Sequence, residues 1–371
     1  MNIKTLPLIP LLLLGMAGCD HSQPFDPARQ PPLGPWSTGS VRRLTFSPGD
    51  DRTPSWLPDG SGIMYSSERE DRRDHDRCLN VLPPEGGTVM RSICPTNPSQ
   101  DDTTNLMESP VVSPDGMIFY HQVTSWIGQQ KLGLSALMLG PATDPLAASL
   151  VLQLPYTAPN GLIHSSIRSP AWAGPNTLVY LAELLFYEGS SFLPDTFYTG
   201  LDVVQLDVSG GTASLQVVPG TDDASSVAVS DAAGIIYYTI GGDSLVYRRD
   251  LVSGIIDTVH NFGDSNIVRD VTVRGNHLVA VVGRSVVWQY EPDHLRFIQR
   301  DEGGDLHFLN LVTGQESVFA TDTTLFRHPV LSPDGQWAVV EASPFAPPHL
   351  RPESGFTAMN HRDDLWLFRV P

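Results

Sequence analysis

The chain has 371 residues and a formal net charge of −18 at pH 7, with 41% hydrophobic and 17% charged residues. This balance is typical of a globular protein and excludes a disordered one. A chain this acidic, without a run of Lys and Arg, is not expected to bind nucleic acid or an anionic membrane surface directly. Its 32 Gly and 32 Pro favour many turns between short strands.

The first residues read as an export signal. Met1–Lys4 is a short basic start, and Leu6–Gly18 is apolar, ends in small residues and is too short for a membrane span. The segment closes with Gly15-Met16-Ala17-Gly18-Cys19, which resembles the lipobox of bacterial lipoproteins. The resemblance implies cleavage before Cys19 and acylation of that residue, while the alternative is an ordinary secretory peptide in which Cys19 is incidental. We therefore expect a signal peptide over residues 1–18 and a lipidated cysteine with a Pro-rich tether over residues 19–40.

One phrase then returns along the chain: apolar residues, Ser-Pro-Asp-Gly and a β-type run. It is clearest at Ser113-Pro114-Asp115-Gly116 and at Ser332-Pro333-Asp334-Gly335, with a close variant at Leu57-Pro58-Asp59-Gly60. Pro presets φ at the second turn position and Gly accepts a positive φ at the last, so each copy predicts a strand, a tight turn and a second strand. Weaker copies cover residues 169–180, 227–238 and 271–279.

A second predicted hairpin follows the copies, as at residues 245–259 and 305–319. Each repeat therefore holds four strands, and consecutive copies lie roughly 45 to 60 residues apart, which is the range of propeller blades. The sequence predicts an all-β fold, a β-propeller of four-stranded blades over residues 41–371.

Two cysteines flank one hairpin of the first repeat. Residues 79–82 and 89–93 form its strands and Pro84-Glu85-Gly86-Gly87 its turn. If the turn centres on Gly86, paired positions sum to 172, as do 78 and 94. Cys78 and Cys94 then face each other across adjacent strands, and export favours their oxidation to a disulfide. Two separate buried thiols are the alternative.

These repeats resemble those of the TolB-type β-propeller. In that family each repeat reads apolar-Ser-Pro-Asp-Gly, then a strand, then Leu-Trp-x-x-Asp-Leu-x-x-Gly and a final strand. The resemblance covers residues 41 to 371 and is strongest in the first, second and last repeats. It implies the fold and leaves the function open, because such propellers serve many roles. TolB pairs its propeller with an N-terminal α/β domain for which this chain has no room, so a role in the Tol system is not expected.

The two ends of the repeat region predict a closed ring. Asp364–Val370 reads as a third strand without a fourth, and Val41–Phe46 as a fourth strand without a blade before it. Their pairing completes one blade and removes an open sheet edge, which gives six blades. An extra hairpin over residues 284–299 is interpreted as an insertion in the fifth blade, with a seventh blade as the alternative.

Loop lengths predict the binding face. Turns between first and second strands are short, whereas the connections from second to third strands are long at residues 67–77, 183–200, 283–304 and 343–363. Functional groups tend to lie on loops held by a rigid scaffold. One of these connections carries more aromatic area than a solvated loop needs: Phe186, Tyr187, Phe192, Phe197 and Tyr198. These rings are candidate ligand contacts, and the alternative is that they cover the channel or a neighbouring blade.

Motifs of catalysis are mostly absent. The sequence has no Gly-x-Ser-x-Gly elbow, Walker loop, dinucleotide glycine motif or paired Cys-x-x-Cys. His121 and His328 are the channel-mouth candidates for acid–base or metal work. The oligogalacturonate lyases, an enzyme group of this architecture, have a histidine-rich metal site, but no histidine pair here has the required close spacing. Both residues read more simply as polar strand-end residues, and neither a catalytic residue, a metal site nor a cofactor is predicted.

The resulting hypothesis is a non-enzymatic, lipid-anchored propeller of the bacterial cell envelope that binds an envelope protein or a glycan through one elaborated loop face. It is expected to contact the membrane only through its lipid, in the outer membrane and facing the periplasm or the surface, with no nucleic-acid partner. The alternative is an envelope enzyme of the propeller-lyase or glycoside-processing type acting at the channel mouth. A third reading is a structural lipoprotein without a discrete ligand.

Overall fold

The computed structural model describes fifteen stretches of the chain between residues 40 and 371. They are residues 40–46, 50–68, 76–95, 103–126, 134–154, 156–157, 163–188, 195–209, 213–231, 234–284, 287–291, 296–300, 304–320, 324–344 and 363–371. The predicted signal peptide and Cys19 lie outside these stretches. Among the described residues, no helix is long and apolar enough to cross a membrane.

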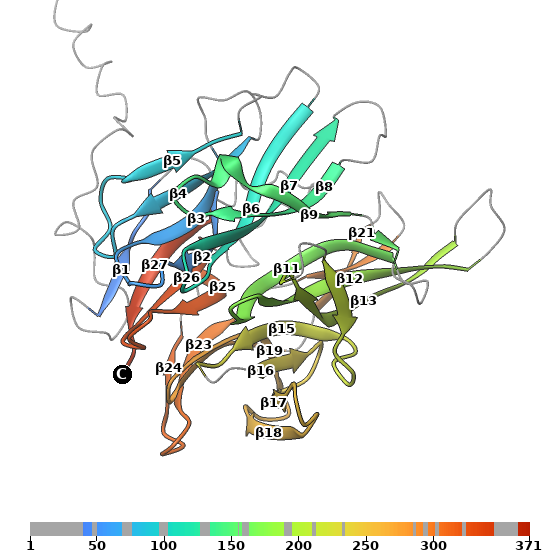
Figure 1. Ribbon diagram of the computed structural model, residues 1–371. Helices are drawn as coiled ribbons and strands as arrows, with labels where there is room; N and C mark the ends of the chain where they lie inside the picture. The colour runs from blue at the N-terminus through green and yellow to red at the C-terminus, as the bar shows by residue number, and fades with distance from the viewer. Residues whose placement is uncertain are drawn as a thin grey trace, which may run out of the picture.

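Among the described residues, the regular secondary structure consists of β-strands, nearly all paired antiparallel, and one short 3-10 helix at Pro145–Ala147 (Figure 1). The first eight strands beyond β1 form one sheet, in which two antiparallel meanders meet through a parallel pair, Arg77 with Leu106. The first meander comprises β2 (Asp51–Trp56), β3 (Ile63–Glu68), β4 (Arg77–Leu82) and β5 (Arg91–Ile93). The second comprises β6 (Thr103–Val112), β7 (Met117–Trp126), β8 (Leu134–Pro141) and β9 (Ser149–Leu154).

The remaining sheets repeat the same up-and-down order. A five-stranded sheet contains β10 (Tyr156–Thr157), β11 (Ile163–Gly174), β12 (Thr177–Glu188), β13 (Asp195–Asp207) and β14 (Ser214–Val217). A four-stranded sheet contains β15 (Ala224–Val229), β16 (Ile235–Ile240), β17 (Leu245–Asp250) and β18 (Ile256–Asn261). Another contains β19 (Asn266–Arg274), β20 (His277–Arg284), β23 (Asp305–Asn310) and β24 (Glu316–Phe319). The arrangement is an all-β, propeller-like succession of sheets, most of them built on four antiparallel strands.

The chain ends meet in the last sheet, which contains β25 (Thr324–Leu331), β26 (Trp337–Pro344), β27 (Asp364–Arg369) and β1 (Val41–Arg43). β1 pairs antiparallel with β27, and Val41 lies opposite Phe368. Figure 1 shows this blue strand beside the red ones. The predicted pairing of the N-terminal and C-terminal strands is confirmed.

The repeated Ser-Pro-Asp-Gly phrase forms tight turns between first and second strands. Gly116 has a φ of 78° and its N–H donates to the Ser113 carbonyl at 2.9 Å. Gly335 has a φ of 69°, and the Ser332 hydroxyl of the same turn accepts a hydrogen bond from the Trp337 N–H at 3.0 Å. These positive φ angles explain why Gly occupies the last turn position.

The extra hairpin predicted over residues 284–299 is an insertion between β20 and β23. It consists of β21 (Val287–Glu291) and β22 (Arg296–Arg300), which form a two-stranded sheet of their own. β20 meanwhile pairs directly with β23, with His277 opposite Asn310. The four-stranded sheet is therefore complete without the insertion.

The disulfide between Cys78 and Cys94 is present, with 4.3 Å between the two Cα atoms. β4 pairs with β5 in the register predicted from the turn, because Leu79 lies opposite Ile93 and Val81 opposite Arg91. The bond closes the start of β4 onto the residue that follows β5.

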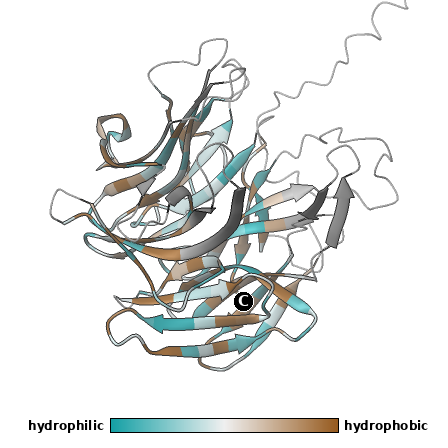
Figure 2. Ribbon diagram, turned by 90° about the vertical axis from the view of Figure 1, so that its right-hand side faces the viewer, coloured by the Kyte–Doolittle hydropathy of each residue, from teal (hydrophilic) through white to brown (hydrophobic). Residues whose placement is uncertain are grey.

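Hydrophobic and hydrophilic residues alternate along many strands (Figure 2), and neighbouring sheets pack through the apolar ones. One cluster combines residues from the sheet of β19, β20, β23 and β24 with residues from the last sheet, including the aromatic rings of Phe308, Phe326 and Phe368. Another joins Trp56 and Ile63 to Val339, Leu365 and Leu367 across the meeting point of the two chain ends. Packing between sheets, rather than within one, therefore provides the core.

Candidate binding site at the channel mouth

The first strands of the meanders share an irregularity at the same place. A register shift interrupts the pairing with the second strand in β2, β6, β11, β15, β19 and β25. In four of these strands, a non-glycine residue with positive φ stands directly before a proline. These residues are Thr53 (49°), Ser109 (51°), Ser169 (48°) and His328 (44°). Proline has no N–H to give to the partner strand, so the bulge falls where pairing is already lost.

These six strands line a central cavity of about 380 Å³. Its wall is rich in Pro, Val, Ala and Trp side chains and includes the four bulged residues with positive φ. The indole N–H of Trp56 donates to the Val330 carbonyl at 3.1 Å, and that of Trp172 donates to the Val111 carbonyl at 3.3 Å. Both indoles therefore bridge neighbouring sheets and present an apolar surface to the cavity.

Hydrogen bonds from backbone to side chain link the lining strands around the channel. The Ser109 N–H donates to the Thr53 hydroxyl at 3.1 Å, and the Thr53 N–H in turn donates to the Glu341 carboxylate. At the neighbouring junction, between β25 and β19, the His328 N–H donates to the Asp270 carboxylate at 3.0 Å. Further along the wall, the Val271 N–H donates to the Ser226 hydroxyl at 3.0 Å. These bonds hold adjacent sheets in register and satisfy polar groups of the wall, which leaves a rigid and mainly apolar lumen.

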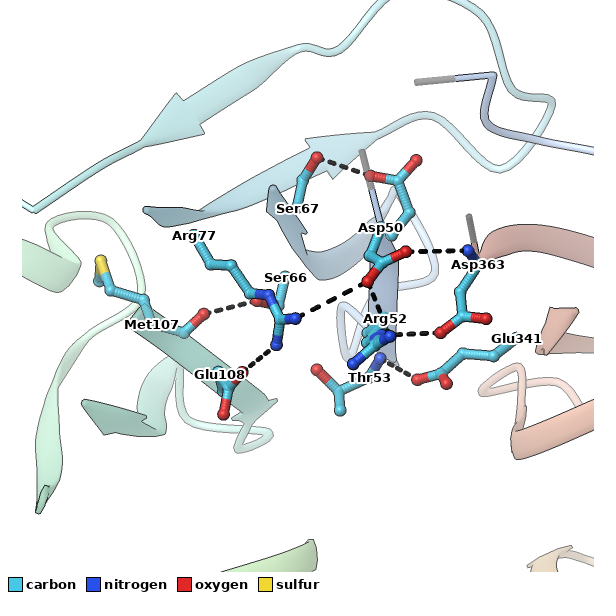
Figure 3. Close-up of polar contacts among 11 residues, drawn as sticks. Asp50, Arg52, Thr53, Ser66, Ser67, Arg77, Met107, Glu108, Glu341 and Asp363 are labelled. Carbon is cyan, nitrogen blue, oxygen red and sulfur yellow. Dashed lines mark hydrogen bonds and ion pairs between the residues drawn. The ribbon is translucent and has the colours of Figure 1, made fainter. Parts of the chain in front are cut away.

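A network of ion pairs lies beside β2, next to the bulge at Thr53 (Figure 3). The Arg52 guanidinium lies 2.7 Å from Asp50 and 2.7 Å from Asp363, which precedes β27. Arg77 lies 3.8 Å from Asp50 and pairs with Glu108 of β6. Figure 3 shows both arginines directed at the Asp50 carboxylate. The network thus joins the last sheet to the first two meanders.

His328 and Glu341 form a further ion pair, with 2.9 Å between Nδ1 and Oε1. Burial alone would lower the pKa of His328, but the carboxylates of Glu341 and Asp270 raise it to about 9. Burial alone would raise the pKa of Glu341, but the charge and hydrogen bond of His328 hold it below its usual value. His328 is therefore a cation at neutral pH on the wall of the cavity.

Asp51 lies beside this network and is fully buried. The Ser67 hydroxyl donates to its Oδ1 atom at 2.6 Å. Burial raises its pKa to about 7, against the opposing effect of the hydroxyls of Ser67 and Thr45. This carboxyl group is thus poised to titrate near neutral pH.

The mouth lies on the face predicted to carry the long connections. First strands begin where second strands end, as the pairs Asp51 with Ser67 and Thr324 with Pro344 show. The ends of the second strands lead into the long connections, of which 69–75 and 345–362 lie outside the described residues. The fixed channel and the variable connections therefore share one face.

The aromatic connection is shorter than the sequence predicted. β12 continues to Glu188 and β13 begins at Asp195, and these two residues pair. The strands, rather than a loop, carry Phe186, Tyr187, Phe197 and Tyr198, while Phe192 falls outside the described residues. The nearly continuous apolar run over residues 178–187, broken only by Glu183, is the signal that β12 extends this far, and the assignment to a loop overlooked it.

The two histidines predicted at the mouth lie apart. His328 lines the cavity. His121 lies in β7, a second strand, where it is 7% exposed, contacts the Ser135 hydroxyl and is not among the lining residues. Burial lowers the pKa of His121, although Glu108 opposes the shift. In the described residues, no group of three or more His, Cys, Asp or Glu is arranged to hold a metal ion.

Sequence reasoning did not identify the bulged ring or its ion pairs. A signal existed, because Thr53, Ser109, Ser169 and His328 each stand immediately before a proline, and Arg or Glu precedes each of them. The acidic partners Glu341 and Asp363 carry no such signal, since they come from strands that only the closed fold brings to this point.

Comparisons with known proteins define the fold. No family model matches the chain and no curated protein matches it. Among solved structures, TolB from Acinetobacter baumannii is similar, with a TM-score of 0.50 and 15% identity over 84% of this chain. A gluconolactonase, XC5397 from Xanthomonas campestris, has a TM-score of 0.50 and 12% identity over 89% of each chain. The chain spans 64% of the length of the TolB structure. At these identities the likeness concerns the fold alone, and that fold is a TolB-type β-propeller.

Proposed function

We propose that this protein is a lipid-anchored, non-enzymatic β-propeller of the cell envelope that binds a partner at the channel mouth. In this proposal residues 1–18 are a signal peptide, residues 19–40 a lipidated cysteine and tether, and residues 41–371 the propeller. Cys19 carries the lipid and holds the protein in the outer membrane, with the propeller facing the periplasm or the surface.

The proposal counts six blades. The eight-stranded sheet is taken as two blades, since its two meanders meet through the parallel pair of Arg77 and Leu106. The bulged first strands support this number, because six of them line one cavity in the described chain. β21 and β22 then form an insertion rather than a blade of their own.

The observation that carries the proposal is the lumen, a cavity held rigid by bonds between sheets. Its wall is mainly apolar, and two of its hydroxyl groups and both of its indoles already bond to neighbouring strands. A glycan needs many free polar groups, whereas an extended protein segment presents apolar side chains to such a wall. The geometry therefore favours an envelope protein over a glycan as the partner.

Site-directed photocrosslinking in cells tests this face. A crosslinking residue at Arg168, which is exposed directly before the bulge at Ser169, is expected to trap a discrete partner. The matched control is Val312, which is 72% exposed in the β23–β24 turn on the opposite face. Equal products from both positions, or none from Arg168, would contradict binding at the mouth.

The extended hairpin supplies a second test. Tyr187→Ala combined with Tyr198→Ala is expected to weaken capture of the crosslinked partner at least about tenfold, because aromatic contacts often dominate interfaces. The melting temperature should stay nearly unchanged. Unimpaired capture together with early melting would assign these residues to packing instead.

An enzyme remains the second candidate, on the specific observation that the His328–Glu341 ion pair opens onto the cavity. The similarity to a gluconolactonase concerns the fold and assigns no role to any residue of this chain. Turnover of a sugar lactone or an acidic glycan by the purified protein, abolished in His328→Gln, would favour this candidate over the binding scaffold.

A further inference from the structure

Arg249 is a buried arginine without an acidic partner. It lies in β17, in register with Ile236 on one side and Ile256 on the other, and only 9% of the residue is exposed. Its Nε atom is buried and has no hydrogen-bond acceptor. Within the described residues, no ion pair or hydrogen bond involves this side chain.

The neighbouring Arg248, in contrast, is exposed and has an acidic partner. Successive side chains of a strand point to opposite faces, so Arg248 faces away from Arg249. Arg248 is 39% exposed at its side chain and lies 3.1 Å from the Asp257 carboxylate. Buried charges in proteins are almost always paired, because an isolated one costs several kcal/mol of desolvation. Arg249 has no such partner: its Nε atom is buried, whereas Nη1 and Nη2 keep accessible surface and are available to a ligand.

Two glycines border the ends of the guanidinium. A Cβ atom at Gly220 would lie 3.5 Å from Nη1 and 3.2 Å from Ile256 Cδ1, and one at Gly254 would lie 3.7 Å from Nη2. Both glycines have positive φ, 72° and 74°. The segment that leads from β14 to β15 thus passes Arg249 without a side chain at Gly220.

The other polar groups on this face are already engaged. The Tyr238 hydroxyl donates to the Gly220 carbonyl at 3.1 Å, and the Tyr247 hydroxyl donates to Asp243 at 2.6 Å. The rings of Tyr238 and Tyr247 stack with 5.4 Å between centroids. The wall beside Arg249 is therefore aromatic and preorganised, and the missing component is an acceptor for the guanidinium.

We propose that Arg249 is the anchor of an oxyanion-binding site between β17 and the segment at Gly220. A planar guanidinium binds two oxygens of a carboxylate or phosphate side by side, and such charge-assisted bonds are the strong ones. The ligand approaches Nη1 and Nη2, which lie beside the two glycines. The site is separate from the channel, because Arg249 is not among the residues that line the cavity.

Thermal melting and titration calorimetry with inorganic phosphate test the site. The wild-type protein is expected to melt higher in phosphate than in sodium chloride of equal ionic strength, since a ligand that binds only the folded state stabilises it. Arg249→Met, of similar length and uncharged, should keep the fold and lose phosphate affinity at least about tenfold. In chloride it should melt at nearly the same temperature, because no ion pair within the described residues is lost.

The control is Arg248→Met, which removes an arginine from the opposite face of the same strand and should keep the phosphate response. A parallel titration with acetate separates a phosphate ligand from a carboxylate ligand. A response to either ion that disappears in Arg249→Met supports the site. No response to either ion in the wild type, or a response that Arg249→Met retains, overturns it.

Discussion

At the scale of single residues, the buried carboxyl group of Asp51 makes stability depend on pH. Its pKa is about 7 in the folded protein, because burial disfavours the charge, against an ordinary value of 3.8. Between these values the folded state retains a proton that the unfolded state has lost. The free energy of unfolding therefore falls as pH rises from about 4 to about 7, by roughly 4 kcal/mol at about 1.4 kcal/mol per unit.

Asp51→Asn removes this titration while keeping an oxygen for the Ser67 hydroxyl. We expect the melting temperature of the variant to fall much less between pH 5 and pH 8 than that of the wild type. Asp115→Asn, at an exposed turn, serves as the control and should follow the wild type. Parallel profiles for Asp51→Asn and the wild type would show that Asp51 does not titrate in this range.

The proposed membrane anchor depends on Cys19. Its place after Met16-Ala17-Gly18 predicts acylation, and two or more acyl chains hold a protein stably on a membrane. A clickable fatty-acid analogue should label the wild type and not Cys19→Ser, and the variant should leave the membrane fraction. Equal labelling of both proteins would end the lipoprotein interpretation.

At the scale of elements, the disulfide constrains the β4–β5 hairpin. The bond between Cys78 and Cys94 spans a sequence separation of 16. Loop entropy in the unfolded chain gives such a bond about 3 kcal/mol. Replacing both cysteines by alanine should lower the free energy of unfolding by about that amount in denaturant titrations. Reductant should lower the free energy of unfolding of the wild type to that of the variant and leave the variant unaffected. A wild type whose stability does not change with reductant would argue against a stabilising bond.

Gly304 tests the junction that follows the β21–β22 insertion. A Cβ atom there would lie 2.4 Å from the backbone carbon and oxygen of Val282, so the chain has to shift to accept one. Gly304→Ala is therefore expected to destabilise the protein by about 1–3 kcal/mol, the usual cost of overpacking. Gly174→Ala is the control, because its Cβ atom would meet Thr177 at an ordinary 3.8 Å. Equal stability of the two variants would contradict the close approach.

At the scale of the whole molecule, β1 closes the ring of sheets. It covers the edge of β27, and Arg43 lies 2.5 Å from the Asp364 carboxylate. A mature chain that starts at Val41 keeps these contacts, whereas one that starts at Leu44 leaves the edge of β27 unpaired. An unpaired edge invites pairing with another chain.

We expect the chain starting at Leu44 to melt several degrees lower and to self-associate, as measured by calorimetry and by light scattering after size exclusion. The chain starting at Val41 should match the full mature protein in both measurements. A monomeric Leu44 chain of unchanged melting temperature would show that closure does not depend on β1.

The sequence by itself determined the features that depend on neighbours along the chain. Pro and Gly at defined turn positions set the tight turns at Gly116 and Gly335, and turn symmetry about Gly86 set the register that brings Cys78 to Cys94. Incomplete repeats at the two ends sufficed to predict the pairing of β1 with β27. Each of these follows from local backbone geometry or from hydrogen bonds between adjacent strands.

Only the tertiary structure decided which charges meet at the channel mouth. Arg52 pairs with Asp363 across 311 residues of sequence, and the Thr53 N–H finds Glu341 across 288. Pairing of this kind depends on how the sheets close around the channel, and no local pattern encodes it. The same holds for Arg249, whose burial is set by a segment from the preceding sheet passing over it at Gly220. The surroundings of a side chain depend on packing between strands that are distant in sequence. The contacts at the channel mouth and around Arg249 could therefore be identified from the fold and not from sequence motifs.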